Sequence, residues 1–215
     1  MDLAKVFASG GVVMFPLLGF SILAVALILE RIRFWWQVAK RQDPFVRIVL
    51  GLYQRSPQAA LQQLEQNRDL PIARIFLAAL QLDQPTPDEF RLALESAAQA
   101  EIPLLKRFST VFETIISLAP LLGLLGTILG LISSFASLKI GDVGGGNTIG
   151  VSAGISEALV STASGLTVAI FTLLFANTFR GLYLRQIALI QEYGGQLELL
   201  YRHRYERGRK PYAPT

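Results

Sequence analysis

The sequence contains no cysteine and a single histidine, His203, among its 215 residues. A chain without cysteine has no disulfide, no thiolate metal site and no cysteine nucleophile, and one histidine cannot supply a set of imidazole ligands for zinc. No combination of nucleophile, base and orienting group is visible either. We therefore expect no enzymatic activity, no metal site and no cofactor.

Charged residues are also scarce, at 17% of the chain against 52% hydrophobic residues, and the mean hydropathy is +0.43. The charges are concentrated between long uncharged stretches, which is the pattern of a chain that crosses a bilayer and returns to water. The net charge of +4 fits the excess of basic residues on the cytoplasmic side of membrane proteins better than it fits nucleic-acid binding.

Three segments carry no charge: residues 11–29, 114–138 and 158–179. At 1.5 Å per residue, 19 helical residues cover about 28 Å, enough to cross the hydrocarbon core. The first segment could be a secretory signal, but its apolar run is too long and no small-x-small cleavage site precedes Glu30. We expect it to be retained as an anchor.

Lysine and arginine near the ends of these segments predict the orientation. Only Lys5 precedes the first segment and only Lys139 lies between the last two, whereas the other flanking positions are basic: Arg31, Arg33, Lys40, Arg41, Lys106, Arg107, Arg180 and Arg185. The positive-inside rule then places the N-terminus and the 139–152 turn outside the cell membrane and the C-terminus inside.

These observations predict an all-α integral membrane protein with three transmembrane helices, the second and third of which extend into a helical cytoplasmic domain. The predicted order is 1–10 periplasmic, 11–30 first span, 31–112 cytoplasmic helices, 113–138 second span, 139–152 periplasmic turn, 153–179 third span and 180–215 cytoplasmic helix and basic tail. The tail at 202–210 suits contact with anionic lipid or simple solvation, and both remain open.

Helix starts are predicted within the cytoplasmic segment at Ser56-Pro57 and at Thr86, where Pro87 and Glu89 complete a capping box. From Pro87 we expect one helix that runs directly into the second span, with a bend at Pro103.

Small residues form a stripe on each of the last two spans. On the second span these residues fall within roughly 100° of one another on a helix of 3.6 residues per turn: Gly123, Gly126, Thr127, Gly130 and Ser134. On the third span they occupy one face: Ala158, Thr162, Gly165, Ala169 and Thr172, with Glu157, Ser161 and Ser164 beside them. Such stripes allow close helix packing, and the hydroxyls also suit an interior that conducts protons.

Glu157 is the one acidic residue that the sequence places plausibly within a span. A carboxylate in the bilayer is a functional candidate because it is costly, but a structural role at the outer end of the third span is equally open. The middle of the spans holds hydroxyls and no titratable group, so a partner helix would have to supply a titrating carboxylate.

The spans resemble those of the MotA/TolQ/ExbB proton channel family, most closely its ExbB and TolQ branch. The similarity lies in MFPLL (14–18) and ILER (28–31), in APLLGLLGTILG (119–130) followed by Ser134-Phe135, and in GISEALVSTASGL (154–166) with Asn177. The chain departs from the family at Phe171, where family members commonly carry proline after Val-Ala-Ile.

The resemblance implies a subunit that assembles as a pentamer in the bacterial inner membrane around an ExbD/TolR-like single-span protein with a membrane aspartate. Proton flow would then act indirectly on a TonB/TolA-like protein. Carried over by position, Thr127 and Thr162 are pore hydroxyls and Glu157 is the outer-end carboxylate. The remaining alternative is a membrane scaffold that conducts no ions, in which the glycine stripes serve packing and the cytoplasmic helices recruit proteins.

Overall fold

A computed structural model of the protein describes residues 10–137 and 148–209, and within these ranges the regular structure is entirely α-helical. Three helical stretches are long and apolar enough to cross a membrane: Met14–Arg55, Pro87–Ala136 and Gly150–Arg207. The all-α, three-span expectation is confirmed. The chain divides into two compact units, one of Met1–Arg31 and Phe108–Phe179 and one of Ile32–Arg107 and Arg180–Thr215.

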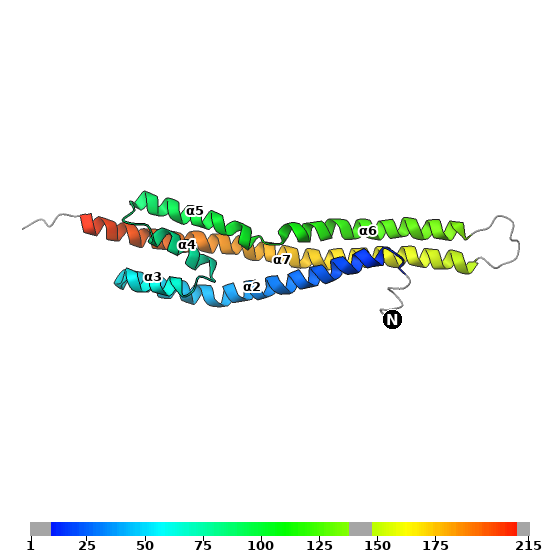
Figure 1. The fold of residues 1–215 in the computed structure, drawn as a ribbon, viewed down its shortest axis with the longest axis horizontal. Coiled ribbons are helices and arrows are strands. Elements are labelled where there is room, and N and C mark those ends of the chain that lie inside the picture. The colour runs from blue at the N-terminus through cyan, green and yellow to red at the C-terminus, as the bar shows by residue number, and fades with distance from the viewer. Residues whose placement is uncertain (1–9, 138–147, 210–215) are drawn as a thin grey trace, which may run out of the picture. The chain divides into compact units, whose positions relative to one another are not determined.

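The first unit contains the apolar parts of three helices (Figure 1): the beginning of α2 (Met14–Arg55), all of α6 (Ser109–Ala136) and α7 (Thr148–Arg209) as far as Phe179. Helices α6 and α7 run antiparallel, side by side. The third helix begins at Thr148, five residues before the expected start of the third span. Most of the expected turn lies outside the described residues.

The second unit contains the rest of α2 and α7 together with three shorter helices: α3 (Pro57–Glu65), α4 (Pro71–Leu80) and α5 (Pro87–Leu105). Both predicted helix starts are confirmed. The Ser56 side chain accepts a hydrogen bond from the backbone N–H of Ala59 at 3.4 Å. At Thr86 both bonds of the capping box form, and the Glu89 carboxylate accepts the backbone N–H of Thr86 at 2.7 Å.

The single helix expected from Pro87 into the second span is interrupted. Helix α5 ends at Leu105, two residues after Pro103, and Phe108 then adopts a left-handed conformation with φ of 67° before α6 begins at Ser109. A residue with a left-handed backbone conformation cannot continue a right-handed helix. The bend expected at Pro103 is therefore replaced by a complete break, whereas α7 passes Phe171 as one continuous helix.

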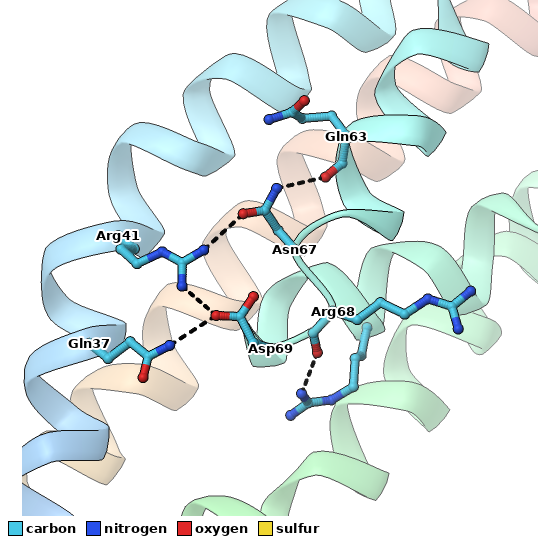
Figure 2. A network of polar contacts seen from close by, with 7 residues as sticks. Gln37, Arg41, Gln63, Asn67, Arg68 and Asp69 are labelled. Carbon is cyan, nitrogen blue, oxygen red and sulfur yellow. Dashed lines mark hydrogen bonds and ion pairs between the residues drawn. The ribbon is translucent and has the colours of Figure 1, made fainter.

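Polar contacts fix the helices of the second unit. Arg74 on α4 donates two hydrogen bonds of 2.6 Å to the Glu101 carboxylate on α5. In Figure 2, Arg41 and Gln37 on α2 reach Asp69 in the turn before α4, with the Gln37 bond at 2.9 Å. The first pair thus joins α4 to α5, and the contacts of Asp69 join the turn before α4 to α2.

A buried amide pair joins the two long helices within this unit. The Gln42 and Gln186 side chains are 1% and 3% exposed and donate to each other, at 3.2 and 2.6 Å. Because each amide satisfies the other, burial of these polar groups costs little.

A hydroxyl face on the membrane hairpin

Glycines allow α6 and α7 to approach with almost no side chain between them. A methyl group built on Gly165 would lie 2.4 Å from the carbonyl oxygen of Ala119, and one on Gly130 would lie 2.7 Å from that of Gly154. On Gly123 it would lie 3.1 Å from the Thr162 Cα atom. Since these neighbours are backbone atoms, only glycine fits at this spacing.

Hydroxyl groups on these helices bond to carbonyl oxygens across the same interface. Thr162 donates to the Gly123 carbonyl at 3.1 Å, and Ser161 reaches the same oxygen at 3.3 Å. Nearer the turn, Ser134 donates to the Val151 carbonyl at 3.1 Å. Together with the glycine contacts, these bonds set the register of the hairpin.

The remaining small residues of the two predicted stripes also lie at or beside this interface. Gly126, Ala158, Ala169 and Thr172 are buried and Ser164 is partly buried. The Thr172 hydroxyl donates to its own helix, to the Val168 carbonyl at 2.7 Å. Most of the small stripe is thus occupied by packing within this chain.

The beginning of α2 covers one side of the hairpin. Met14 and Leu17 of α2, with Val13 just before it, form an apolar cluster with Ala119 and Ala169. Two further side chains pack against that cluster. These are Leu122 on α6 and Val168 on α7. The side of the hairpin that carries Leu122 and Val168 is therefore the side that α2 occupies.

Thr127 and Thr162 lie together on the opposite side. At about 100° per residue, Thr127 is about 140° from Leu122 around α6, and Thr162 is about 120° from Val168 around α7. Both threonines are partly buried, and the Thr127 hydroxyl donates to the Leu124 carbonyl at 2.6 Å. The structure therefore brings the two candidate pore hydroxyls to one face that α2 does not cover.

Exposed apolar side chains border the two threonines on this face. Leu124 and Leu166 stand beside the threonines with 54% and 47% of their surface exposed. The two hydroxyls are thus bordered by exposed apolar surface.

Glu157 does not share this face. Its carboxylate lies against Gly11, which has a φ of 70°, and a methyl group built on Gly11 would lie only 1.7 Å from the Glu157 Oε1 atom. The acid therefore lies in the N-terminal part of α7, against the residues that immediately precede α2. Gly11 was not predicted from the sequence, because nothing near it in the sequence indicates that it lies against the side chain of Glu157.

Outside the spans, the Arg74 guanidinium has a raised pKa because it is hydrogen-bonded to the Glu101 carboxylate. At the end of α7, Arg202 lies 3.4 Å from Glu198 and 3.8 Å from Asp88, so this part of the predicted basic tail makes ion pairs within the chain. No cluster of three His, Cys, Asp or Glu residues that could hold a metal occurs within residues 10–137 and 148–209.

Comparison with known proteins shows what this arrangement is similar to. The profile of the MotA/TolQ/ExbB proton channel family matches residues 67–192. The chain is 62% identical, over 96% of its length and 99% of the relative's, to biopolymer transport protein ExbB-like 3 of Synechocystis sp.. It is 45% identical to ExbB-like 1 of the same organism over 91% of its length and 78% of the relative's, and 42% identical to the ExbB of Aquifex aeolicus over 39% of its length and 54% of the relative's.

Proposed function

Because the chain belongs to the MotA/TolQ/ExbB proton channel family, we propose that it is the proton-conducting subunit of an ExbB-type complex. The proposed complex uses the proton-motive force to energise outer-membrane transport or envelope processes. The membrane-protein class and the general ExbB-like transport role follow from the three apolar helices and the relatives. The proton path and its partners are the proposal.

The observation that carries the proposal is the shared face of Thr127 and Thr162 on the side of the hairpin away from α2. A hydroxyl group both donates and accepts hydrogen bonds, so it can hydrogen-bond to water and to a neighbouring carboxyl group in either protonation state. Neither threonine can take up a charge, and the stretch 114–138 contains no acid, lysine, arginine or histidine. The group that titrates beside the two threonines then comes from another chain.

The proposed partner is an ExbD/TolR-like protein with one membrane span and one aspartate in it. A membrane carboxylate costs about 2.5–3.5 kcal/mol on insertion scales, and the threonine hydroxyls would reduce this cost by hydrogen bonding. Each proton that crosses 100 mV supplies about 2.3 kcal/mol. That energy is comparable to the cost of exposing the charged aspartate to the apolar face.

The proposed assembly is a ring, a pentamer by family analogy, in the bacterial inner membrane with the N-terminus periplasmic and the C-terminus cytoplasmic. Its output would act on a TonB/TolA-like protein. Hydroxyls without additional carboxylates at the level of Thr127 and Thr162 favour H⁺ over Na⁺, since a bare Na⁺ site uses several oxygen ligands.

The test is proton flux into liposomes that contain this protein and its single-span partner. We expect the double variant Thr127→Val, Thr162→Val to reduce flux about tenfold or more, because a hydrogen bond to a charged group contributes about 1.5–3 kcal/mol. Thr167→Val is the matched control. Thr167 lies on α7, as Thr162 does, but it is exposed, and its hydroxyl donates to the Ala163 carbonyl of the same helix at 2.7 Å.

If proton flux is unchanged in the double variant, the two threonines are not part of the proton path. The scaffold alternative is favoured by one observation, namely that the glycine stripe is occupied by packing inside the chain. A scaffold would show no flux that depends on the partner aspartate, so replacement of that aspartate by asparagine separates the two functions.

A further inference from the structure

Glu113 is an acid that the hairpin register brings into the membrane-spanning part of the first unit. It lies in the second turn of α6, which begins at Ser109, and its side chain is exposed. In the sequence it immediately precedes the uncharged stretch 114–138 and so resembles a residue at the edge of a span. The contacts between α6 and α7 instead indicate that Glu113 lies deeper within the span.

The register follows from contacts along the whole interface. Ser134 meets Val151, Gly130 meets Gly154, and Gly165 meets Ala119. Continued toward the beginning of α6, the same antiparallel register sets Glu113 opposite Phe171 to Phe175. The neighbouring Phe112 ring, 5.9 Å from that of Phe179, agrees with this because both rings lean toward the N-termini of their helices.

The depth of Glu113 can then be estimated from α7. Arg180, the first charged residue after the uncharged stretch of α7, lies five to nine residues beyond the part opposite Glu113. At 1.5 Å per residue this distance is about 8–14 Å. Glu113 therefore lies about one and a half to two and a half turns deeper in the apolar layer than the charge that ends the third span.

Glu113 also belongs to the threonine side of α6. Glu113, Pro120 and Thr127 follow one another at intervals of seven residues, and a straight helix drifts only about 20° per seven residues. The three side chains thus form one line along the helix. Pro120 has no N–H, so the carbonyl group of Ile116, which lies between Glu113 and Pro120 along the chain, lacks its usual helical donor.

A carboxylate at this depth is costly, and such residues in membrane proteins usually face an interior or a water-filled cavity. Glu113 shares its line with Thr127, the candidate pore hydroxyl, and the carbonyl of Ile116 lies between them as a further polar group. On these grounds we propose that Glu113 is the proton acceptor at the inner end of the path. The proposal rests on the proposed function, because it extends the same hydroxyl face toward the cytoplasm.

In the proposed step, the partner's protonated aspartate gives its proton to a water molecule on the hydroxyl face while that water gives a proton to the Glu113 carboxylate. The aspartate becomes a carboxylate, the water stays neutral, and Glu113 becomes a neutral carboxylic acid. It then releases the proton to water on the cytoplasmic side and returns to the carboxylate.

The experiment compares Glu113→Gln with Thr114→Val in the complete complex with its single-span partner, reconstituted in liposomes. Gln keeps the size of the side chain but cannot exchange a proton, so we expect proton flux to fall about tenfold or more while the native mass of the complex is unchanged. Thr114 is the next residue on α6, and its hydroxyl donates to its own Thr110 carbonyl at 2.8 Å. We expect its variant to conduct like the wild type.

A second measurement does not depend on a variant. Dicyclohexylcarbodiimide modifies protonated carboxyl groups in apolar surroundings, and we expect mass mapping of the wild-type complex to find Glu113 modified. Flux in Glu113→Gln equal to that in Thr114→Val overturns the proposal. If Glu113→Gln does not assemble, an unmodified Glu113 in the wild type overturns it.

The two proposals fail separately. If the Thr127 and Thr162 double variant loses flux and Glu113→Gln does not, the pore remains and the inner acceptor is rejected. If the double variant conducts normally, the hydroxyl face itself is rejected.

Discussion

Replacement of Gly165 by alanine should force the two helices of the hairpin apart. The added methyl group would lie 2.4 Å from the Ala119 carbonyl oxygen and 3.1 and 3.2 Å from two backbone atoms of Gly123. An ordinary contact begins at 3.4 Å, so the nearest pair must separate by about 1 Å, and backbone atoms of a helix cannot rotate away as a side chain does. Overpacking of this kind costs about 1–3 kcal/mol.

The chain offers a matched control in Gly19→Ala. Gly19 also lies in the apolar part of a membrane helix, α2, but a methyl group built there meets no atom within 4 Å. We expect this variant to be neutral or more stable by about 0.5–1 kcal/mol, because alanine is the better helix former. Thermal unfolding of both purified variants in the same detergent measures the difference.

The separation also has a functional consequence. An opening of about 1 Å would stretch the Thr162 hydrogen bond to the Gly123 carbonyl from 3.1 Å beyond the usual limit for such a bond. We therefore expect Gly165→Ala to lower proton flux as well as stability. Equal unfolding temperatures for the Gly165→Ala and Gly19→Ala proteins would refute the close approach on which this reasoning depends.

Two further predictions concern the second unit. Glu101→Met should destabilise the protein by about 2–3 kcal/mol in thermal unfolding, somewhat below the cost of breaking a fully buried pair, because the Arg74 side chain is 33% exposed. The double variant with Arg74→Met should recover most of the loss, and a double variant as unstable as the single one would contradict this account. Hydrogen bonds from Thr86 lower the pKa of Glu89 below 4.5, so this cap stabilises the protein above about pH 4.5 and is lost as the pH falls through the lowered value. Acid titration of unfolding in wild type and Glu89→Gln should show that the variant lacks this part of the acid sensitivity, and identical titrations would argue against it.

The three spans and the starts of α3 and α5 could be predicted because their signals are local. A run of about 20 uncharged residues has few structural outcomes, and Thr86 with Glu89 three residues later forms its hydrogen bonds within one helical turn. The break at Phe108 could not be predicted in the same way. No glycine marks the left-handed residue there, and the apolar pattern continues on both sides of it.

The arrangement of the candidate site depended on contacts between distant segments. Each stripe of small residues could be read from helical periodicity, but periodicity on one helix does not show which neighbour covers which side. The position of α2 against Leu122 and Val168 separates Thr127 and Thr162 from Glu157. Similarly, Glu101 on α5 pairs with Arg74, which lies 27 residues earlier in the sequence, and periodicity along α5 does not reveal that partner.

The position of α2 also bears on how copies of the chain could enclose a pore. Its outward face carries Phe15, Ile22 and Leu29, each more than 60% exposed and seven residues apart, and such a line of large apolar side chains suits lipid. The threonines lie on the other side of the hairpin from α2. In a ring with α2 outermost, each copy would direct its hydroxyl face inward. A single-span partner at the centre would then meet Thr127 and Thr162 of every copy.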